Sequence, residues 1–151
     1  MEMFRSINNS ASGLTAQRLR MDVASSNIAN ADSTRATMNE NGEWEPYRRK
    51  MVTFQPQESS FRSFLNQATG KSSNPGQGVR ATRIIEDEEP FKNVYQPNHP
   101  DAGENGYVQM PNVDPLKEMT NMMSATRSYE ANVTSMNASK NMMMKALEIG
   151  R

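Results

Sequence analysis

The residues of this chain best suited to chemistry are a run of acids, which spans Glu86-Asp87-Glu88-Glu89 directly before Pro90. Paired carboxylates can cleave glycosides when one of them is buried and protonated while the other stays solvated. Four adjacent acids before a proline offer no such difference in environment. We therefore predict a solvated strand end here, with no catalytic residue.

The single histidine and a short basic cluster offer no better site. A zinc site needs three or four ligands, and the chain has no cysteine and no histidine other than His99. The cluster Arg48-Arg49-Lys50 is expected on a surface strand, because 17 basic residues balance 17 acidic ones and give no overall attraction to nucleic acid. No phosphate-binding loop, dinucleotide fingerprint or serine elbow is present. The sequence predicts no metal, no cofactor and no nucleic-acid partner.

The composition indicates a chain that gains order through neighbours. The 151 residues suit one domain with an insertion, but Leu, Ile, Val and Phe together make up only about 15% of them. Thirteen methionines favour adaptable helix packing. No stretch is long and apolar enough for a membrane span. The first thirty residues contain no apolar stretch typical of a secretory signal, so we expect any export to use a route without signal cleavage.

Near both ends of the chain, residues recur at alternating spacings of three and four, and in each set six of the eight are apolar. The N-terminal set is Phe4, Ile7, Ala11, Leu14, Arg18, Met21, Ser25 and Ile28, and the C-terminal set is Met122, Thr126, Tyr129, Val133, Met136, Lys140, Met143 and Leu147. This spacing is typical of a coiled-coil seam. From these sets we expect helix pairing and assembly to use Ile7, Leu14, Met21, Ile28, Met122, Tyr129, Val133, Met136, Met143 and Leu147.

The ends of both helices carry start and stop signals. The first helix is expected over residues 3–30, with Gly13 permitting a close helix approach. The second is expected to begin at Asp114-Pro115, where the acid caps free backbone N–H groups and proline suits the first helical position. It should run to about Ile149 and end at Gly150.

Residues 35–110 have a different character, because glycine and proline punctuate the whole stretch. Short strands are predicted at Tyr47–Thr53, Val79–Glu86, Phe91–Tyr95 and Tyr107–Met110, with a flexible loop over residues 70–78. The predicted class is α+β: two long terminal helices that pair as an antiparallel coiled coil, with a small β-rich insertion. The predicted division is 1–34 for the first helix and a signature loop, 35–110 for the insertion, and 111–151 for the last helix, which packs with 1–34.

Asparagines occur in both predicted helices: Asn8, Asn9, Asn27 and Asn30 in the first, and Asn121, Asn132, Asn137 and Asn141 in the last. Asparagine is a mediocre helix former. It can donate and accept hydrogen bonds across a helix contact or toward a wet channel. Ordinary exposure to solvent is the alternative, and the sequence leaves both readings open.

Several stretches resemble a known family. Residues 24–34, ASSNIANADST, are similar to the N-terminal signature of bacterial flagellar rod and hook proteins. Residues 106–119, GYVQMPNVDPLKEM, together with RSYEANV at 127–133 and ALEIG at 146–150, resemble more narrowly the proximal-rod proteins of the basal body. The signature residues carried by this resemblance are Asn27, Ala29, Asn30, Thr34, Pro111, Asn112 and Asp114.

The resemblance implies a non-enzymatic subunit of a helical tube in the basal body, within the cell envelope. In that family the two terminal helices pair and form the inner wall of the rod around the export channel, and the assembled tube transmits torque. Subunits leave through the flagellar type III export apparatus without signal cleavage. The implied partners are copies of the chain itself, other rod proteins of the FlgB, FlgF and FlgG types, and a base adaptor of the FliE type.

Three alternatives remain at this stage. A different axial rod subunit would share most of these features. A cytoplasmic coiled-coil adaptor or chaperone would share the helices but would not need the signature at residues 25–34 or the insertion. A hydrolase acting on cell-wall glycan would need a carboxylate pair in a cleft, which the sequence does not support.

Overall fold

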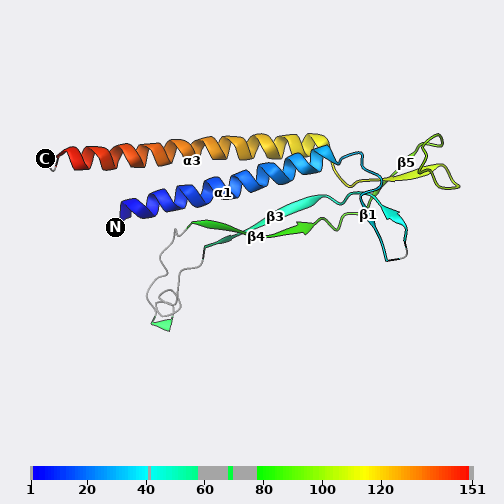
Figure 1. Cartoon of the computed structure of the whole chain (residues 1–151), viewed down its shortest axis with the longest axis horizontal. Coiled ribbons are helices and arrows are strands. Elements are labelled where there is room, and N and C mark those ends of the chain that lie inside the picture. Colours follow the sequence, from blue (N-terminus) through cyan, green and yellow to red (C-terminus); the bar gives the residue numbers. More distant parts are fainter. Residues whose placement is uncertain (1, 41, 58–67, 70–77, 150–151) are drawn as a thin grey trace. The chain divides into compact units, whose positions relative to one another are not determined.

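In sequence order, three pairs of short strands lie between two long helices (Figure 1). The structure is a computed structural model that describes residues 2–40, 42–57, 68–69 and 78–149. Its elements are α1 (Glu2–Ala29), β1 (Thr37–Met38), β2 (Trp44–Glu45), β3 (Lys50–Pro56), β4 (Val79–Glu86), β5 (Lys92–Tyr95), β6 (Tyr107–Met110) and α3 (Pro115–Ile149). The predicted α+β class is confirmed. The loop predicted at residues 70–78 lies outside the described residues, except for Gly78.

The two helices begin and end close to their predicted positions. Helix α3 starts as its capping signal indicates: the Oδ1 atom of Asp114 accepts hydrogen bonds from the backbone N–H groups of Leu116 at 3.0 Å and Lys117 at 3.4 Å. Proline at the next position loses no helical hydrogen bond. The predicted stop at Gly150 lies outside the described residues.

The strands form three separate two-stranded sheets, β1–β2, β3–β4 and β5–β6. The prediction of Val79–Glu86 and Tyr107–Met110 is confirmed, whereas the first predicted strand begins three residues too early. Its early residues bind elsewhere: the N–H of Tyr47 donates to the carbonyl of Ser33 at 3.0 Å, and the N–H of Arg49 donates to the side chain of Asn112 at 2.8 Å. The short β1–β2 pair was not predicted.

The chain divides into two compact units that both helices enter. Unit 1 comprises residues 1–19, 53–83 and 124–151, and unit 2 comprises residues 20–52 and 84–123. The sequence-based division at 34/35 and 110/111 follows the secondary structure instead, and it stays a prediction.

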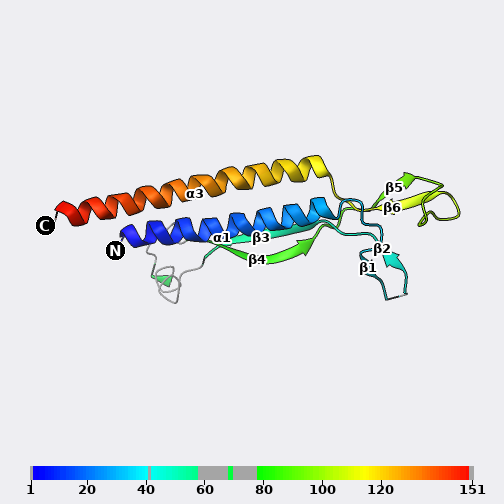
Figure 2. The same cartoon turned by 45° about the horizontal axis from the view of Figure 1, so that its top comes forward.

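Within unit 1 the two helices lie side by side, as Figures 1 and 2 both show. The hydroxyl oxygens of Ser6 and Ser139 are 3.0 Å apart, within hydrogen-bond distance. A Cβ atom built on Gly13 would lie 3.0 Å from the side-chain nitrogen of Asn132. Only glycine allows so close an approach, because any side chain would force Asn132 to move.

The start of β4 is held against α1 in the same unit. The N–H of Val79 donates to the hydroxyl of Ser12 at 3.1 Å. The preceding Gly78 has φ of +91°, and a Cβ there would lie 2.5 Å from the same hydroxyl. Glycine therefore meets two requirements at this turn, a left-handed backbone and a close contact with a helix.

Candidate functional site

The contacts between the helices include several pairs of small or polar side chains: Ser6 with Ser139, Gly13 with Asn132, and Asn27 with Glu118. The buried residues of α1 are Ser10, Gly13, Ala16, Ala24 and Asn27, and those of α3 are Glu118, Ala125 and Ser139. These side chains let two helices approach closely and hydrogen-bond across the contact. Among the largest helical residues, exposure is common; Leu147, for example, is 73% exposed.

The predicted helix-pairing residues lie at the borders of this face. The half-buried ones are Ile7, Leu14, Met21, Ile28, Met122, Tyr129, Val133, Met136 and Met143, and Leu147 is exposed. The remaining positions of the two predicted sets are exposed: Phe4, Ala11, Arg18, Ser25, Thr126 and Lys140. The role of these residues in assembly stays a prediction.

At four positions of the predicted stripe, the residue before the predicted one is buried within the chain instead. On α1, Ser10 and Ala24 are buried in place of Ala11 and Ser25. On α3, Ala125 and Ser139 are buried in place of Thr126 and Lys140. One residue turns a helix face by about 100°. The prediction followed apolar character, whereas close packing selects small side chains, and the large apolar residues flank the contact.

Unit 2 contains a buried polar junction, which we define as Asn27, Tyr47, Arg49, Asp87, Asn112 and Glu118. At its centre, Asn27 of α1 is 0% exposed. Its amide nitrogen donates to the carbonyl of Lys50 at 2.8 Å and to Oε2 of Glu118 at 3.0 Å. Its amide oxygen accepts from the N–H of Lys50 at 2.9 Å and the hydroxyl of Tyr47 at 3.0 Å. Asn27 thus uses its full hydrogen-bonding capacity to join α1, α3 and the start of β3.

Glu118 and Arg49 form the charged part of the junction. The side chain of Glu118 is 3% exposed and that of Arg49 11%. The Nε and Nη2 atoms of Arg49 donate to Oε1 of Glu118 at 2.9 Å and 2.7 Å, and its Nη1 atom donates to Asp87 at 2.9 Å. A buried charge is tolerated only when it is paired and hydrogen-bonded in this way.

The pKa values of the junction reflect these contacts. Burial alone would lower the pKa of Arg49, but its hydrogen bonds to Glu118 and Asp87 outweigh burial, so the pKa lies above the ordinary value. The hydrogen bond from Arg49 holds the pKa of Asp87 below its ordinary value, against partial burial. The junction is therefore built for a protonated guanidinium and an ionised aspartate.

Asn112 ties the junction to the chain before β5. Its side-chain oxygen accepts from the N–H of Arg49 at 2.8 Å, while its amide nitrogen donates to the carbonyls of Asp87 at 3.3 Å and Glu89 at 3.0 Å. The Asp87 N–H donates in turn to the Arg49 carbonyl at 2.8 Å. Backbone groups that a sheet would otherwise satisfy are satisfied here by one buried side chain.

A second cluster in unit 2 connects the loop after α1 to the loop after β5. Asp101 accepts a hydrogen bond from the hydroxyl of Thr34 at 2.7 Å and from the guanidinium of Arg35. These bonds, that of Thr34 first, hold the pKa of Asp101 below its ordinary value. Thr34 therefore holds the two loops together through its hydroxyl.

The predicted signature residues fall into two groups. Asn27, Pro111 and Asn112 are buried, and Asp114 caps α3. At the end of α1, the amide of Asn30 donates to the carbonyl of Ser26 at 2.9 Å, and Ala29 is exposed. The structure brings Asn27 and Asn112 to the same junction: Asn112 binds the backbone of Arg49, and Asn27 binds Glu118, which pairs with the side chain of Arg49.

Two sequence expectations about charged residues need correction. Arg49 is not a surface residue of the basic cluster, because it pairs with Glu118 and Asp87. Asp87 is not part of a solvated run, because its side chain is only 13% exposed and hydrogen-bonds Arg49. The sequence could not indicate this burial, because the partners of Arg49 lie 38 and 69 residues away.

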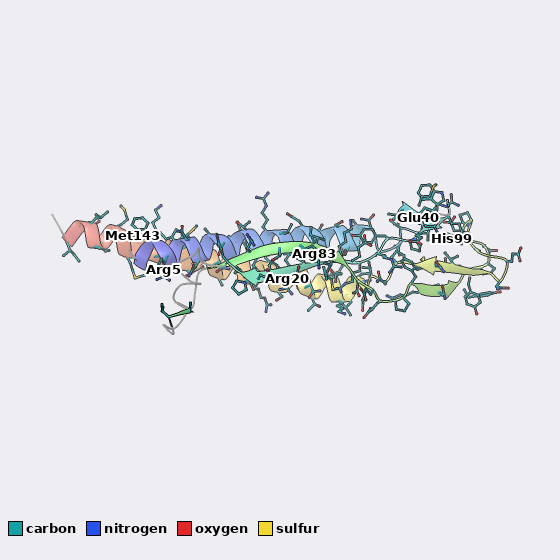
Figure 3. The ribbon with its side chains drawn as sticks, turned by 90° about the horizontal axis from the view of Figure 1, so that it is seen from below. Arg5, Arg20, Glu40, Arg83, His99 and Met143 are labelled. Atoms are coloured by element: carbon teal, nitrogen blue, oxygen red, sulfur yellow. The ribbon has the colours of Figure 1, made fainter. Side chains whose placement is uncertain are left out.

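His99 lies on the loop between β5 and β6, as Figure 3 shows. Its Nδ1 atom accepts a hydrogen bond from the N–H of Asp101 at 3.1 Å. In the part of the chain that the structure describes, no group of three or more His, Asp or Glu side chains is placed to hold a metal ion. No helix among the described residues has the length and apolar character to span a membrane.

Comparison with known proteins gives matches at both ends and over the full length. A family model described as "Flagella basal body rod protein" matches residues 7–37, and one described as "Flagellar basal body rod FlgEFG protein C-terminal" matches residues 104–149. The chain is 61% identical to the flagellar basal-body rod protein FlgC of Bacillus subtilis strain 168 over 151 residues, with 100% of each chain covered. It is 42% identical to the FlgC protein of Salmonella typhimurium strain LT2 over 151 residues, again with 100% of each covered. The FlgC protein of Borreliella burgdorferi strain B31 is 41% identical over 160 residues, covering 99% of this chain and 98% of the relative.

Proposed function

Because this chain belongs to the FlgC family of flagellar basal-body rod proteins, we propose that it is a subunit of the proximal rod, where copies assemble helically into a tube. Its structural role in the basal-body rod follows from membership of the family, and the resemblance seen in residues 24–34 and 106–119 is confirmed. The observation that carries the proposal is 61% identity over the whole of both chains. A different rod subunit would share the shorter terminal matches alone.

We also propose that α1 and α3 pair as an antiparallel coiled coil. The support is the spacing of their contacts. In unit 1, Ser6 meets Ser139 and Gly13 meets Asn132, so both helices advance seven residues in opposite directions. In unit 2, Asn27 meets Glu118. Seven-residue steps on two antiparallel helices are typical of coiled-coil packing.

The finer roles in this proposal come from the family resemblance. The paired helices form the inner wall around the export channel, the assembled tube transmits torque, and the chain has no catalytic activity. Its neighbours are other copies, rod proteins of the FlgB, FlgF and FlgG types and a FliE-type adaptor, and it reaches the cell envelope through the export apparatus without signal cleavage. Exposed apolar residues on α3 support such packing, among them Leu116 at 73% and Met123 at 56%.

Complementation tests the proposal. A Bacillus subtilis strain that lacks its own FlgC protein should regain motility and basal bodies with rods when it produces this chain. Leu14→Asp and Val133→Asp, at two half-buried helix positions, should abolish rods while the protein is still made, because a short acid cannot reach water from an apolar contact. Absence of rods with the unchanged chain, although it is produced and exported, would contradict the proposed function.

A further inference from the structure

The formal charge of the chain is divided unequally between the two units. Over the residues of unit 1 the sequence has ten Lys and Arg against four Asp and Glu, a formal charge of +6. Over the residues of unit 2 it has seven Lys and Arg against thirteen Asp and Glu, a formal charge of −6. The zero net charge of the whole chain is therefore the cancellation of a basic unit and an acidic unit.

Most of the unbalanced charges are available to a partner. In unit 1, exposed basic residues that make no ion pair within the described part of the chain are Arg18, Arg80, Arg83, Arg127 and Lys140. In unit 2, the exposed acids that likewise make no ion pair with a described residue include Asp22, Glu40, Glu43, Glu88, Glu89 and Glu104. Figure 3 labels Arg83 and Glu40 among these side chains. The acids of unit 2 that do form ion pairs, Asp87, Asp101 and Glu118, already have partners inside the unit.

Both units also present apolar side chains beside their charges. In unit 2, Leu116, Met119 and Met123 are exposed on α3. In unit 1, Met142, Met144 and Leu147 are exposed on the same helix. Contact between apolar side chains would attract two copies without selecting which surfaces meet. The charges make that selection, because like-charged surfaces repel and oppositely charged ones attract.

We propose that the acidic unit 2 of one copy docks on the basic unit 1 of a second copy, in a charge-directed, staggered contact. The proposal rests on the proposed function and deepens it by naming the contact that sets the register between copies. Alignment of two copies in register would place unit 1 on unit 1 and unit 2 on unit 2, and both pairs would repel. A stagger replaces repulsion with attraction and makes a head-to-tail contact that need not close.

Two substitutions of the same kind on α3 separate this proposal from an effect of overall charge. Lys117→Glu changes unit 2 from −6 to −8, and Lys140→Glu changes unit 1 from +6 to +4. Both lysines are exposed, and both variants have a net charge of −2. The difference in formal charge between the two units becomes larger in the Lys117→Glu variant and smaller in the Lys140→Glu variant. Circular dichroism and urea unfolding would establish that both variants remain folded.

Static light scattering of the full chain measures attraction between copies through the second virial coefficient, even when association is weak. At about 20 mM NaCl the unchanged chain should attract itself, and at about 500 mM the attraction should decrease, because salt shortens the range of electrostatic forces. At low salt, copies of the Lys117→Glu variant should attract each other more strongly than copies of the Lys140→Glu variant. The two variants should become alike at high salt.

Several results would overturn the proposal. Equal second virial coefficients for the two variants at low salt would show that only the net charge of the chain matters. Stronger attraction between copies of the Lys140→Glu variant would mean that units of like charge meet in the contact. No attraction of the unchanged chain at low salt would mean that its two charged surfaces meet different partners. Complementation separates failure of this proposal from failure of the proposed function. If rods form in the deficient strain but the two variants do not differ in attraction as expected, the charge-directed contact is wrong and the rod function stands.

Discussion

Unit 2 is held together by buried polar side chains, whereas the helices of unit 1 meet through small ones. In unit 2, Asn27 makes four hydrogen bonds and Arg49 makes ion pairs with two acids. In unit 1, Gly13 lies close to Asn132 and Ser6 lies close to Ser139, while Ile149 is 86% exposed. The comparison teaches that unit 2 fixes its own structure through a buried polar network, whereas the described part of unit 1 shows no buried ion pair.

The largest expected effect comes from Arg49→Met, which removes the cation shared by Glu118 and Asp87. It leaves Glu118 buried without its ionic partner, and breaking a buried pair in this way costs about 3–5 kcal/mol. Urea unfolding should show this loss in the free energy of unfolding. Arg48→Met is the matched control: its guanidinium lies 4.4 Å from the centre of the Phe91 ring, a contact of about 0.5–1 kcal/mol. Equal losses in the two variants would remove the special role of the junction.

The next effect is expected for Asn27→Ala. The change leaves the hydroxyl of Tyr47 and the N–H of Lys50 without the acceptor that they share. An unsatisfied buried group costs about 1–3 kcal/mol, and the N–H of Lys50 is only part-buried and lies near the low end, so the total loss should be about 2–4 kcal/mol. Asn30→Ala serves as control, because the side chain of Asn30 hydrogen-bonds only to the nearby residues Ser26 and Ser33. Chemical unfolding of both variants measures the loss in the free energy of unfolding. A loss for Asn30→Ala as large as that for Asn27→Ala would contradict the prediction.

Unit 1 should respond to crowding at Gly13. Gly13→Val places atoms against Asn132, and overpacking typically costs about 1–3 kcal/mol. Asn132→Ala in the same chain should recover much of the loss, because it removes the side chain that clashes. A double-mutant cycle measured by thermal unfolding gives the coupling energy between the two positions. Strictly additive effects would mean that the two helices are not in contact at this point.

The smallest effect is a dependence on pH. The folded-state pKa of Asp87 is below the ordinary value of 3.8, so its stabilisation is present above about pH 4 and is lost as the pH falls through the folded pKa. Urea unfolding between pH 7 and pH 3 should therefore show a smaller acid loss for Asp87→Asn than for the unchanged chain. Identical acid profiles would show that ionised Asp87 does not stabilise unit 2.

The helices and the main strands could be predicted from the sequence because their signals are local. Capping by Asp114 depends on neighbours within three residues, and β4 follows a short alternating segment. At four helix positions the buried residue lies one before the predicted one, because apolar spacing identifies large side chains and a close helix contact selects small ones. At Gly13 alone did the small size of the residue lead us to predict a close contact between the helices.

The junction could be predicted only in part. Asn27 and Asn112 belonged to the signature residues, but nothing local indicated what they bind. Arg49 looked like one member of a basic cluster, because its partners Asp87 and Glu118 are distant in the sequence. A buried ion pair depends on tertiary structure, which spacing along a single chain does not encode.

Hydrogen exchange on the dilute, full-length chain tests the contrast between the two units most directly. Amide groups of residues 20–29 and 115–123, which belong to the helices in unit 2, should be protected by the buried junction. Amide groups of residues 2–19 and 124–149, in the same two helices but in unit 1, should exchange markedly faster until neighbouring copies cover them. Equal protection along the whole of α1 and α3 in the dilute chain would contradict the account, because unit 1 would then be ordered without its neighbours.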